Sequence, residues 1–142
     1  MSCEINNIYT NDDELIDILI STKSIAIIGC SPNENKDSHK VAKYLLEAGY
    51  TIYPVYPKED IILGQKVYRS LDKIPHKVDM VDIFRKAKII ENIVDVCISK
   101  GDIDTIWSQL GLVNNQAMEK ARKHNIKTIQ NLCTKLEHKR LI

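Results

Sequence analysis

Residues 24–30 read SIAIIGC, an uninterrupted apolar run that ends at Gly29. A strand with apolar residues on both of its faces is typical of the interior of a parallel sheet, because helices cover both faces. Similar short runs return at 51–55, 78–84, 105–110 and 126–130. Longer segments with helical spacing separate these runs, so the alternation from Ser24 onward predicts βαβ units.

Five segments carry the helical pattern. They are 12–21, 38–48, 86–99, 114–124 and 132–140. We expect Ser38 and Asn114 to cap two of these helices at the N-terminus, and Gly49 and Gly101 to end two of them. The first helix is expected to pack on the outside of the sheet. Between 56 and 74 the chain is irregular, with a short ribbon at 65–68 and a single helical turn from Ser70.

This alternation predicts an α/β fold: a Rossmann-like, doubly wound sheet of five parallel strands with flanking helices. With the strands numbered along the chain, the expected order is 3-2-1-4-5. The chain has 142 residues, of which 44% are apolar, a size and composition that suit one domain. We therefore expect a single domain over 1–142, with its core at 24–141 and the leading helix at 12–21.

Composition excludes several classes of function. Twenty Lys and Arg stand against nineteen Asp and Glu, a net charge of +1, so no global field favours nucleic acid or an anionic membrane. No apolar run approaches the ~20 residues that span a bilayer, and the polar N-terminus does not resemble a signal peptide, so we expect a cytoplasmic protein. The four cysteines form no C-x-x-C pair, so neither a metal site nor a disulfide framework is expected.

In such sheets a ligand lies beyond the carboxyl ends of the strands, where the strand order reverses. The predicted order places this switch point between strands one and four. The loops that line it are then 29–37, 55–58, 84–86 and 107–111.

The first of these loops begins Gly29-Cys30-Ser31-Pro32 and lacks the second and third glycines of the NAD fingerprint. Gly29 still allows a sharp turn off the strand, the Ser31 hydroxyl could bind a phosphate oxygen, and the helix start near Ser38 offers free N–H groups. These features favour a phosphate near the loop. The alternative is a plain strand-to-helix connection.

Tyr56, Pro57 and Lys58 follow the second strand, where NAD-binding folds usually carry Asp or Glu for the ribose hydroxyls. A cation at this corner favours a phosphorylated ribose, as in NADP or coenzyme A. Alternatively, Lys58 is one of many solvated lysines.

Phe84 and Arg85 follow the third strand, where an aromatic ring and a cation could contact adenine and phosphate. Trp107, Gln109 and Gly111 follow at the end of the fourth strand and could line the cleft. The alternatives are that Phe84 belongs to the core, and that Trp107 is a core residue with a satisfied indole N–H.

Cys30 lies inside the proposed phosphate loop. The following helix and Lys58 would favour its thiolate, and oxidised CoA could then form a mixed disulfide with it, whereas burial would oppose ionisation. The alternative is a small residue chosen for close packing at the turn.

These residues and their order resemble the small stand-alone CoA-binding domain proteins of bacteria, which are related in fold to the N-terminal domain of the succinyl-CoA synthetase α subunit. The resemblance covers 24–141 and is carried by GCSP at 29–32, SHKVAKYL at 38–45, YPVYPK at 53–58, ILG at 62–64, VY at 67–68, VDMVDIFR at 78–85, WSQLG at 107–111 and CTKLEH at 133–138. One departure is Tyr56-Pro57, where the family often has Asn-Pro.

The resemblance implies that Gly29 and Ser31 line the CoA diphosphate, and that Lys58 and Arg85 lie near the phosphorylated ribose. Phe84 would border the adenine or pantetheine together with Trp107. The candidate cofactor-binding residues are Gly29, Cys30, Ser31, Ser38, Tyr56, Pro57, Lys58, Phe84, Arg85, Trp107, Gln109 and Gly111. The ligase activity of the synthetase needs a further domain that is not expected here.

No catalytic constellation is evident. The four histidines are scattered, and Cys133, Glu137 and His138 do not all share one face of the last helix. We therefore expect a module that binds coenzyme A or acyl-CoA without catalysis. The rival interpretations are an NADP-dependent oxidoreductase domain and an interaction protein whose nucleotide cleft is vestigial.

Overall fold

Five parallel strands form the central sheet of the computed structural model, which describes residues 11–142. They are β1 (Ser24–Ile28), β2 (Thr51–Val55), β5 (Met80–Ile83), β6 (Thr105–Ser108) and β7 (Lys127–Ile129). Every neighbouring pair in this sheet runs parallel, which confirms the predicted α/β fold class.

The predicted strand order is wrong. The observed order is β2-β1-β5-β6-β7, so the third main strand pairs with β1 and not with β2. The reason lies in the strands themselves, because all four residues of β5 are buried, whereas β2 carries exposed Thr51 and a proline, Pro54. A proline cannot donate to a strand ladder and is tolerated at a sheet edge, so β2 takes the edge and β5 the interior.

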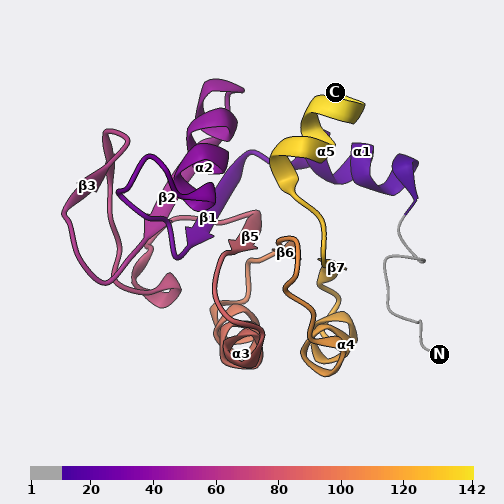
Figure 1. Ribbon diagram of the computed structural model, residues 1–142. Helices are drawn as coiled ribbons and strands as arrows, with labels where there is room; N and C mark the ends of the chain where they lie inside the picture. Colours follow the sequence, from indigo (N-terminus) through magenta and orange to yellow (C-terminus); the bar gives the residue numbers. More distant parts are fainter. Residues whose placement is uncertain (1–10) are drawn as a thin grey trace.

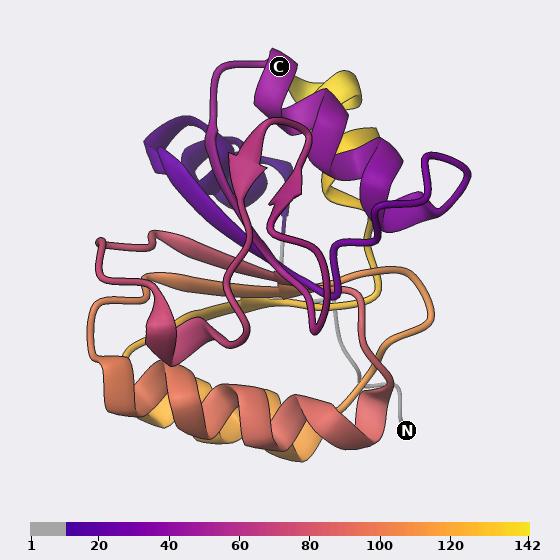
Figure 2. The same ribbon diagram turned by 90° about the vertical axis from the view of Figure 1, so that its left-hand side faces the viewer.

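Helices cover both faces of the sheet (Figures 1 and 2). Three lie on one face: α1 (Asp12–Ser21), α2 (Asp37–Glu47) and α5 (Thr134–Leu141). Two lie on the other: α3 (Ile90–Lys100) and α4 (Asn115–Lys123). Alternate residues of β1 pack into the hydrophobic layers on the two faces of the sheet. Ile25 and Ile27 face α1 and α2, while Ala26 and Ile28 face α3 and α4.

Four smaller elements lie between β2 and α3 along the sequence. They are the hairpin of β3 (Ile61–Ile62) and β4 (Gln65–Lys66), and the 3₁₀ turns η3 (Leu71–Lys73) and η4 (Ala87–Ile89). The hairpin returns the chain to β2, where Val55 bridges Tyr68. Residues far apart in sequence thus meet at the carboxyl end of β2.

The caps follow the expectations with one exception. The Asn114 side chain accepts the Ala117 N–H at 3.0 Å, and Gly101 ends α3 at φ 83°. Ser38 is not the cap of α2: the helix begins at Asp37, and the preceding Lys36 makes no side-chain cap hydrogen bond. The Ser38 hydroxyl is directed to the loop before the helix instead.

Candidate functional site

The switch point lies between β1 and β5, because α2 follows β1 onto one face of the sheet and α3 follows β5 onto the other (Figure 2). The observed strand order therefore moves it from the predicted position between β1 and β6. A crevice at the carboxyl ends of two such strands is where doubly wound folds bind their ligands. The loops that flank it follow Ile28 and Ile83.

Gly29 and Arg85 come from these two loops and lie against each other. The Gly29 N–H donates to Val55 O at 2.9 Å, and the Phe84 N–H donates to Ile28 O at 2.9 Å. A Cβ on Gly29 would lie 2.8 Å from Arg85 Cδ and 2.9 Å from Phe84 O, at a φ of +87°. Only glycine fits here without a shift of Arg85 or of the Phe84 carbonyl.

The loop after β1 is held by its serines. The Ser31 N–H donates to Ser38 Oγ at 2.9 Å, and Ser31 Oγ accepts the Asn33 N–H at 3.0 Å. His39 Nδ1 lies 2.9 Å from Ser31 O. Since Ser31 Oγ is an acceptor in its bond to the loop, its own proton remains available for an anion. The start of α2 has no side-chain cap, but the His39 and Lys40 N–H groups both donate to Lys36 O, and Asp37 places a carboxylate in the first turn.

The corner after β2 carries Tyr56, Pro57 and Lys58. Tyr56 is half-buried against the core layer of α2, while Pro57 and Lys58 are exposed. The structure adds Arg69, which sequence reasoning missed: its Nη1 donates to backbone oxygens of this corner. Only the fold brings Arg69 there, through the β3–β4 hairpin, so the sequence pattern held no local signal for it.

Two of the cations at this edge, Lys58 and Arg85, have no carboxylate partners among the residues that the structure describes. Most of the ion pairs within 11–142 lie elsewhere, on α1, α3, α4, α5 and the amino edge of the sheet. Only the pair of Arg69 and Asp60 at 3.5 Å lies beside the corner. Lys58 and Arg85 are exposed and form no ion pair with any described residue, so they leave positive charge for an anionic ligand.

Trp107 and Gln109 lie in the core, not on a cleft surface. Trp107 is 0% exposed, and its indole N–H donates to Leu132 O at 2.9 Å. The side chain points from β6 into the layer of α1, α2 and α5, so it has no surface for a ligand. Trp107 is therefore a core residue with a satisfied indole N–H, which was the alternative interpretation. The Gln109 amide is likewise engaged inside the protein.

The partner of Gln109 is Asp82, a buried carboxylate that sequence reasoning did not single out. Gln109 Nε2 lies 2.5 Å from Asp82 Oδ1, and the Thr134 hydroxyl donates to Asp82 Oδ2 at 2.8 Å. Burial raises the pKa of Asp82 to about 7, against the lowering effect of these two hydrogen bonds. The network ties β5, β6 and the first residue of α5 together below the carboxyl edge. In the sequence, an acidic residue inside the apolar run 78–84 is the feature that could have indicated this buried network.

Cys30 does not have the exposed thiolate considered from the sequence. It is 0% exposed, and burial raises the pKa of its thiol to about 12. The effect of desolvation on the Cys30 pKa therefore outweighs any effect of the helix and Lys58. Cys30 is a small residue that packs closely at the turn, which was the alternative interpretation. Cys97 is buried as well, Cys133 is half-buried, and Cys3 lies outside the described residues.

Gly111 and Phe84 complete the predicted set. Gly111 is exposed at φ +83°, and its N–H donates to Asn131 Oδ1 at 2.8 Å, which links the loops after β6 and β7. Phe84 is half-buried, with one side against the core layer of α2. The structure thus brings Gly29, Phe84 and Arg85 together at the switch point between β1 and β5.

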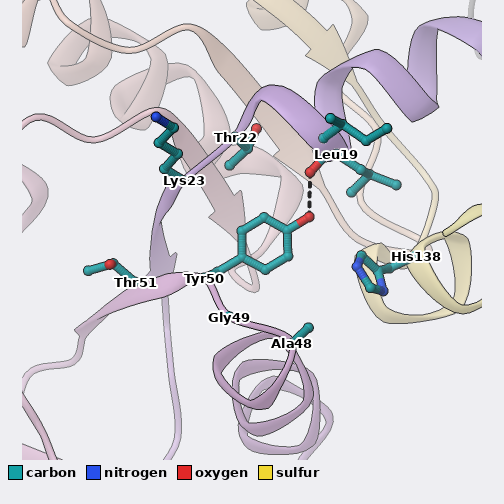
Figure 3. A pocket seen from close by; sticks show the side chains of 9 residues that line it. Leu19, Thr22, Lys23, Ala48, Gly49, Tyr50, Thr51 and His138 are labelled. Carbon is teal, nitrogen blue, oxygen red and sulfur yellow. Dashed lines mark hydrogen bonds between the residues drawn. The ribbon is translucent and has the colours of Figure 1, made fainter.

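A separate hollow of about 400 Å³ lies at the amino end of the sheet, between the ends of α1 and α2 and the side of α5 (Figure 3). Tyr50 and His138 line it; the Tyr50 hydroxyl donates to Leu19 O, and burial lowers the pKa of His138. It is at the wrong edge of the sheet for the switch-point site. We therefore do not assign the nucleotide to it.

No group of three or more His, Cys, Asp or Glu side chains that could hold a metal ion is found among residues 11–142. The histidine rings contact backbone or tyrosines: His39 contacts Ser31 O, His124 contacts Lys120 O, and His138 Nδ1 lies 2.7 Å from the Tyr44 hydroxyl. Glu137 binds Arg140, so it does not pair with His138. In the same part of the chain no helix has the length and apolar character needed to cross a membrane.

Known proteins share this sequence and fold. The family model described as "CoA binding domain" matches residues 23–139. The uncharacterized protein YneT of Bacillus subtilis is 34% identical over 125 residues, which cover 88% of this chain and 92% of YneT. The α subunit of an ADP-forming acetate–CoA ligase I of Pyrococcus furiosus is 35% identical over 129 residues, 80% of this chain but only 28% of that subunit.

The solved structure of a hypothetical protein from Pyrococcus horikoshii superimposes with a TM-score of 0.91, at 38% identity and 99% coverage of both chains. Its architecture agrees with the five-stranded sheet described above. The family match and the identity to YneT over nearly the full length of both chains show that this protein belongs to the CoA binding domain family.

Proposed function

We propose that this protein binds coenzyme A, or an acyl-CoA, in the crevice between β1 and β5 and carries out no chemistry on it. The observation that carries the proposal is the contact of Gly29 with Arg85 at the switch point, beside cations that no described carboxylate neutralises. The diphosphate would lie against the loop after β1, which offers the Gly29 turn, the Ser31 hydroxyl and the start of α2.

The choice of CoA over NAD rests on the corner after β2. Lys58 stands where NAD-binding folds place a carboxylate for the ribose, and a cation suits the 3′-phosphate of CoA. NADP also carries a phosphorylated ribose, but the family of this chain favours CoA. Binding without catalysis is the simpler proposal, because Cys30, the thiol nearest to the crevice, is buried and its raised pKa of about 12 keeps it protonated.

Calorimetric titration with CoA, dephospho-CoA, NADP and NAD tests this proposal. We expect CoA to bind, NAD to give no measurable heat, and the melting temperature to rise with CoA concentration by mass action. Lys58→Met and Arg85→Met should each weaken CoA about tenfold, since each removes one charge-assisted contact. Lys123→Met is the matched control, because Lys123 lies exposed on α4 and should leave the affinity unchanged. Equal affinity for NAD and CoA, or none for CoA, would refute the proposal.

A further inference from the structure

The corner that carries Lys58 is a tight turn whose shape its own sequence does not favour. It comprises residues 56–60, and both of its ends are hydrogen-bonded to the segment that follows the β3–β4 hairpin: the Tyr56 N–H donates to Tyr68 O at 3.0 Å, and the Val67 N–H donates to Asp60 O at 2.9 Å. Between these bonds Glu59 has a φ of 67°, a left-handed conformation that a residue with a Cβ rarely adopts. Something outside the turn must stabilise it.

Arg69 supplies this support. One nitrogen, Nη1, lies 3.1 Å from Tyr56 O, 3.1 Å from Lys58 O and 2.8 Å from Glu59 O. Three carbonyl dipoles therefore point at a single cation, whose charge cancels their mutual repulsion. With those oxygens turned toward Arg69, the backbone of the corner is held in one arrangement.

Arg69 itself is poorly placed to bind a ligand phosphate. Its Nη1 is occupied by the backbone, and its Nη2 lies 3.5 Å from Asp60 Oδ1. Lys58 is the reverse case, because its carbonyl is held by Arg69 while its exposed ammonium pairs with no described carboxylate. The two cations of the corner thus have different roles, one directed at the backbone and one directed outward.

From this arrangement we infer that Arg69 is a specificity-determining positioning residue, which fixes the corner so that Lys58 meets the 3′-phosphate of the bound nucleotide. The inference rests on the proposed function and adds to it the residue that makes the site discriminate between CoA and dephospho-CoA. Arg69 contacts no ligand itself in this proposal.

The test is a double-mutant cycle on the ratio of the two affinities, CoA against dephospho-CoA, measured by calorimetry. Wild type is compared with Arg69→Gln, Lys58→Met and the double variant. Unfolded protein binds neither ligand, so a loss of folded protein cancels from the ratio. Arg122→Gln is the charge-matched control, since Arg122 donates to Thr128 Oγ1 at 2.8 Å and takes no part in the corner.

We expect Lys58→Met to lower the ratio about tenfold and Arg69→Gln to lower it about fivefold. The double variant should stay within about twofold of Lys58→Met, because Arg69 acts only through Lys58, whereas independent contacts would multiply to roughly fiftyfold. Arg122→Gln should keep the wild-type ratio.

An unchanged ratio in Arg69→Gln, or a multiplied loss in the double variant, would overturn the inference. Wild type that binds CoA and dephospho-CoA equally would also overturn it, while leaving the proposed CoA binding intact. Wild type that binds neither ligand would instead remove the proposed function on which the inference rests.

Discussion

Replacing Asp82 by Asn removes the one buried carboxylate among residues 11–142 and should change how stability depends on pH. The Asp82 side chain is 0% exposed, and burial raises its pKa from 3.8 to about 7 in the folded protein. Between these two values the folded protein holds a proton that the unfolded chain releases, so the stabilisation is complete below about pH 4 and is lost as the pH rises to about 7. At about 1.4 kcal/mol per unit, the loss sums to about 4 kcal/mol.

The measurement is urea unfolding followed by circular dichroism at several pH values, for the wild type and Asp82→Asn. The difference between the two proteins isolates Asp82, since all other groups titrate in both. We expect the wild type to lose about 4 kcal/mol relative to Asp82→Asn between pH 4 and pH 8. Asn has the shape of Asp and can still bond Gln109 and Thr134, so the variant should fold.

Two further variants sharpen the test. Thr134→Val removes a hydroxyl that lowers the pKa of Asp82, so the decline should extend to higher pH. Asp79→Asn should behave in the opposite way, because hydrogen bonds from the Lys23 and Ser24 N–H groups and the Lys77 ammonium hold the pKa of Asp79 below its usual value. The stabilisation that the Asp79 carboxylate gives the wild type is present at neutral pH and is lost as the pH falls into the acid range. A pH-independent difference between wild type and Asp82→Asn would refute the reasoning.

Three other predictions follow from burial and close contact. Gly29→Ala should destabilise the fold by about 2 kcal/mol in urea unfolding, through a positive φ and a Cβ 2.9 Å from Phe84 O; a neutral effect would show that the loops separate easily. Cys30 should resist Ellman's reagent at pH 8 until the protein unfolds, because its pKa is about 12, whereas half-buried Cys133 should react in the native state; peptide mapping distinguishes them. Trp107, the single tryptophan, should fluoresce like a buried indole, and its emission maximum should not change when CoA is added. A shift of the maximum on binding would indicate that Trp107 lies close to the ligand.

The sheet was readable from the sequence because β1 and β5 are short, mostly apolar runs, and because an α-helix follows every strand of the main sheet except β2. The strand order was not, although Pro54 held the needed signal: a residue without an N–H belongs to an edge strand. Order matters for function, because it decides which loop lies beside the loop after β1. Both orders include Gly29, and only the observed one places Arg85 against it.

Side-chain direction limited the site prediction more than position did. Trp107 lies in β6 and Gln109 directly follows it at the carboxyl edge, as expected, but both side chains turn into the core. Arg69 is the opposite case, a residue at the site that the sequence analysis did not predict. It follows the β3–β4 hairpin and reaches the corner only because the hairpin folds back toward β2, which a pattern of local residue types does not encode.

The net charge of +1 conceals how the charges are divided between stability and binding. Lys77, Lys100, Lys120 and Arg140 are each paired with carboxylates, and these pairs join α1 to α5, join α3 to α4, and brace the amino edge of the sheet. At the carboxyl edge Lys58 and Arg85 have no such partners among the described residues. Their charges add no ion pair to the fold and remain available to an anionic ligand. The sequence total could not show this division, because it depends on which edge of the sheet each cation occupies.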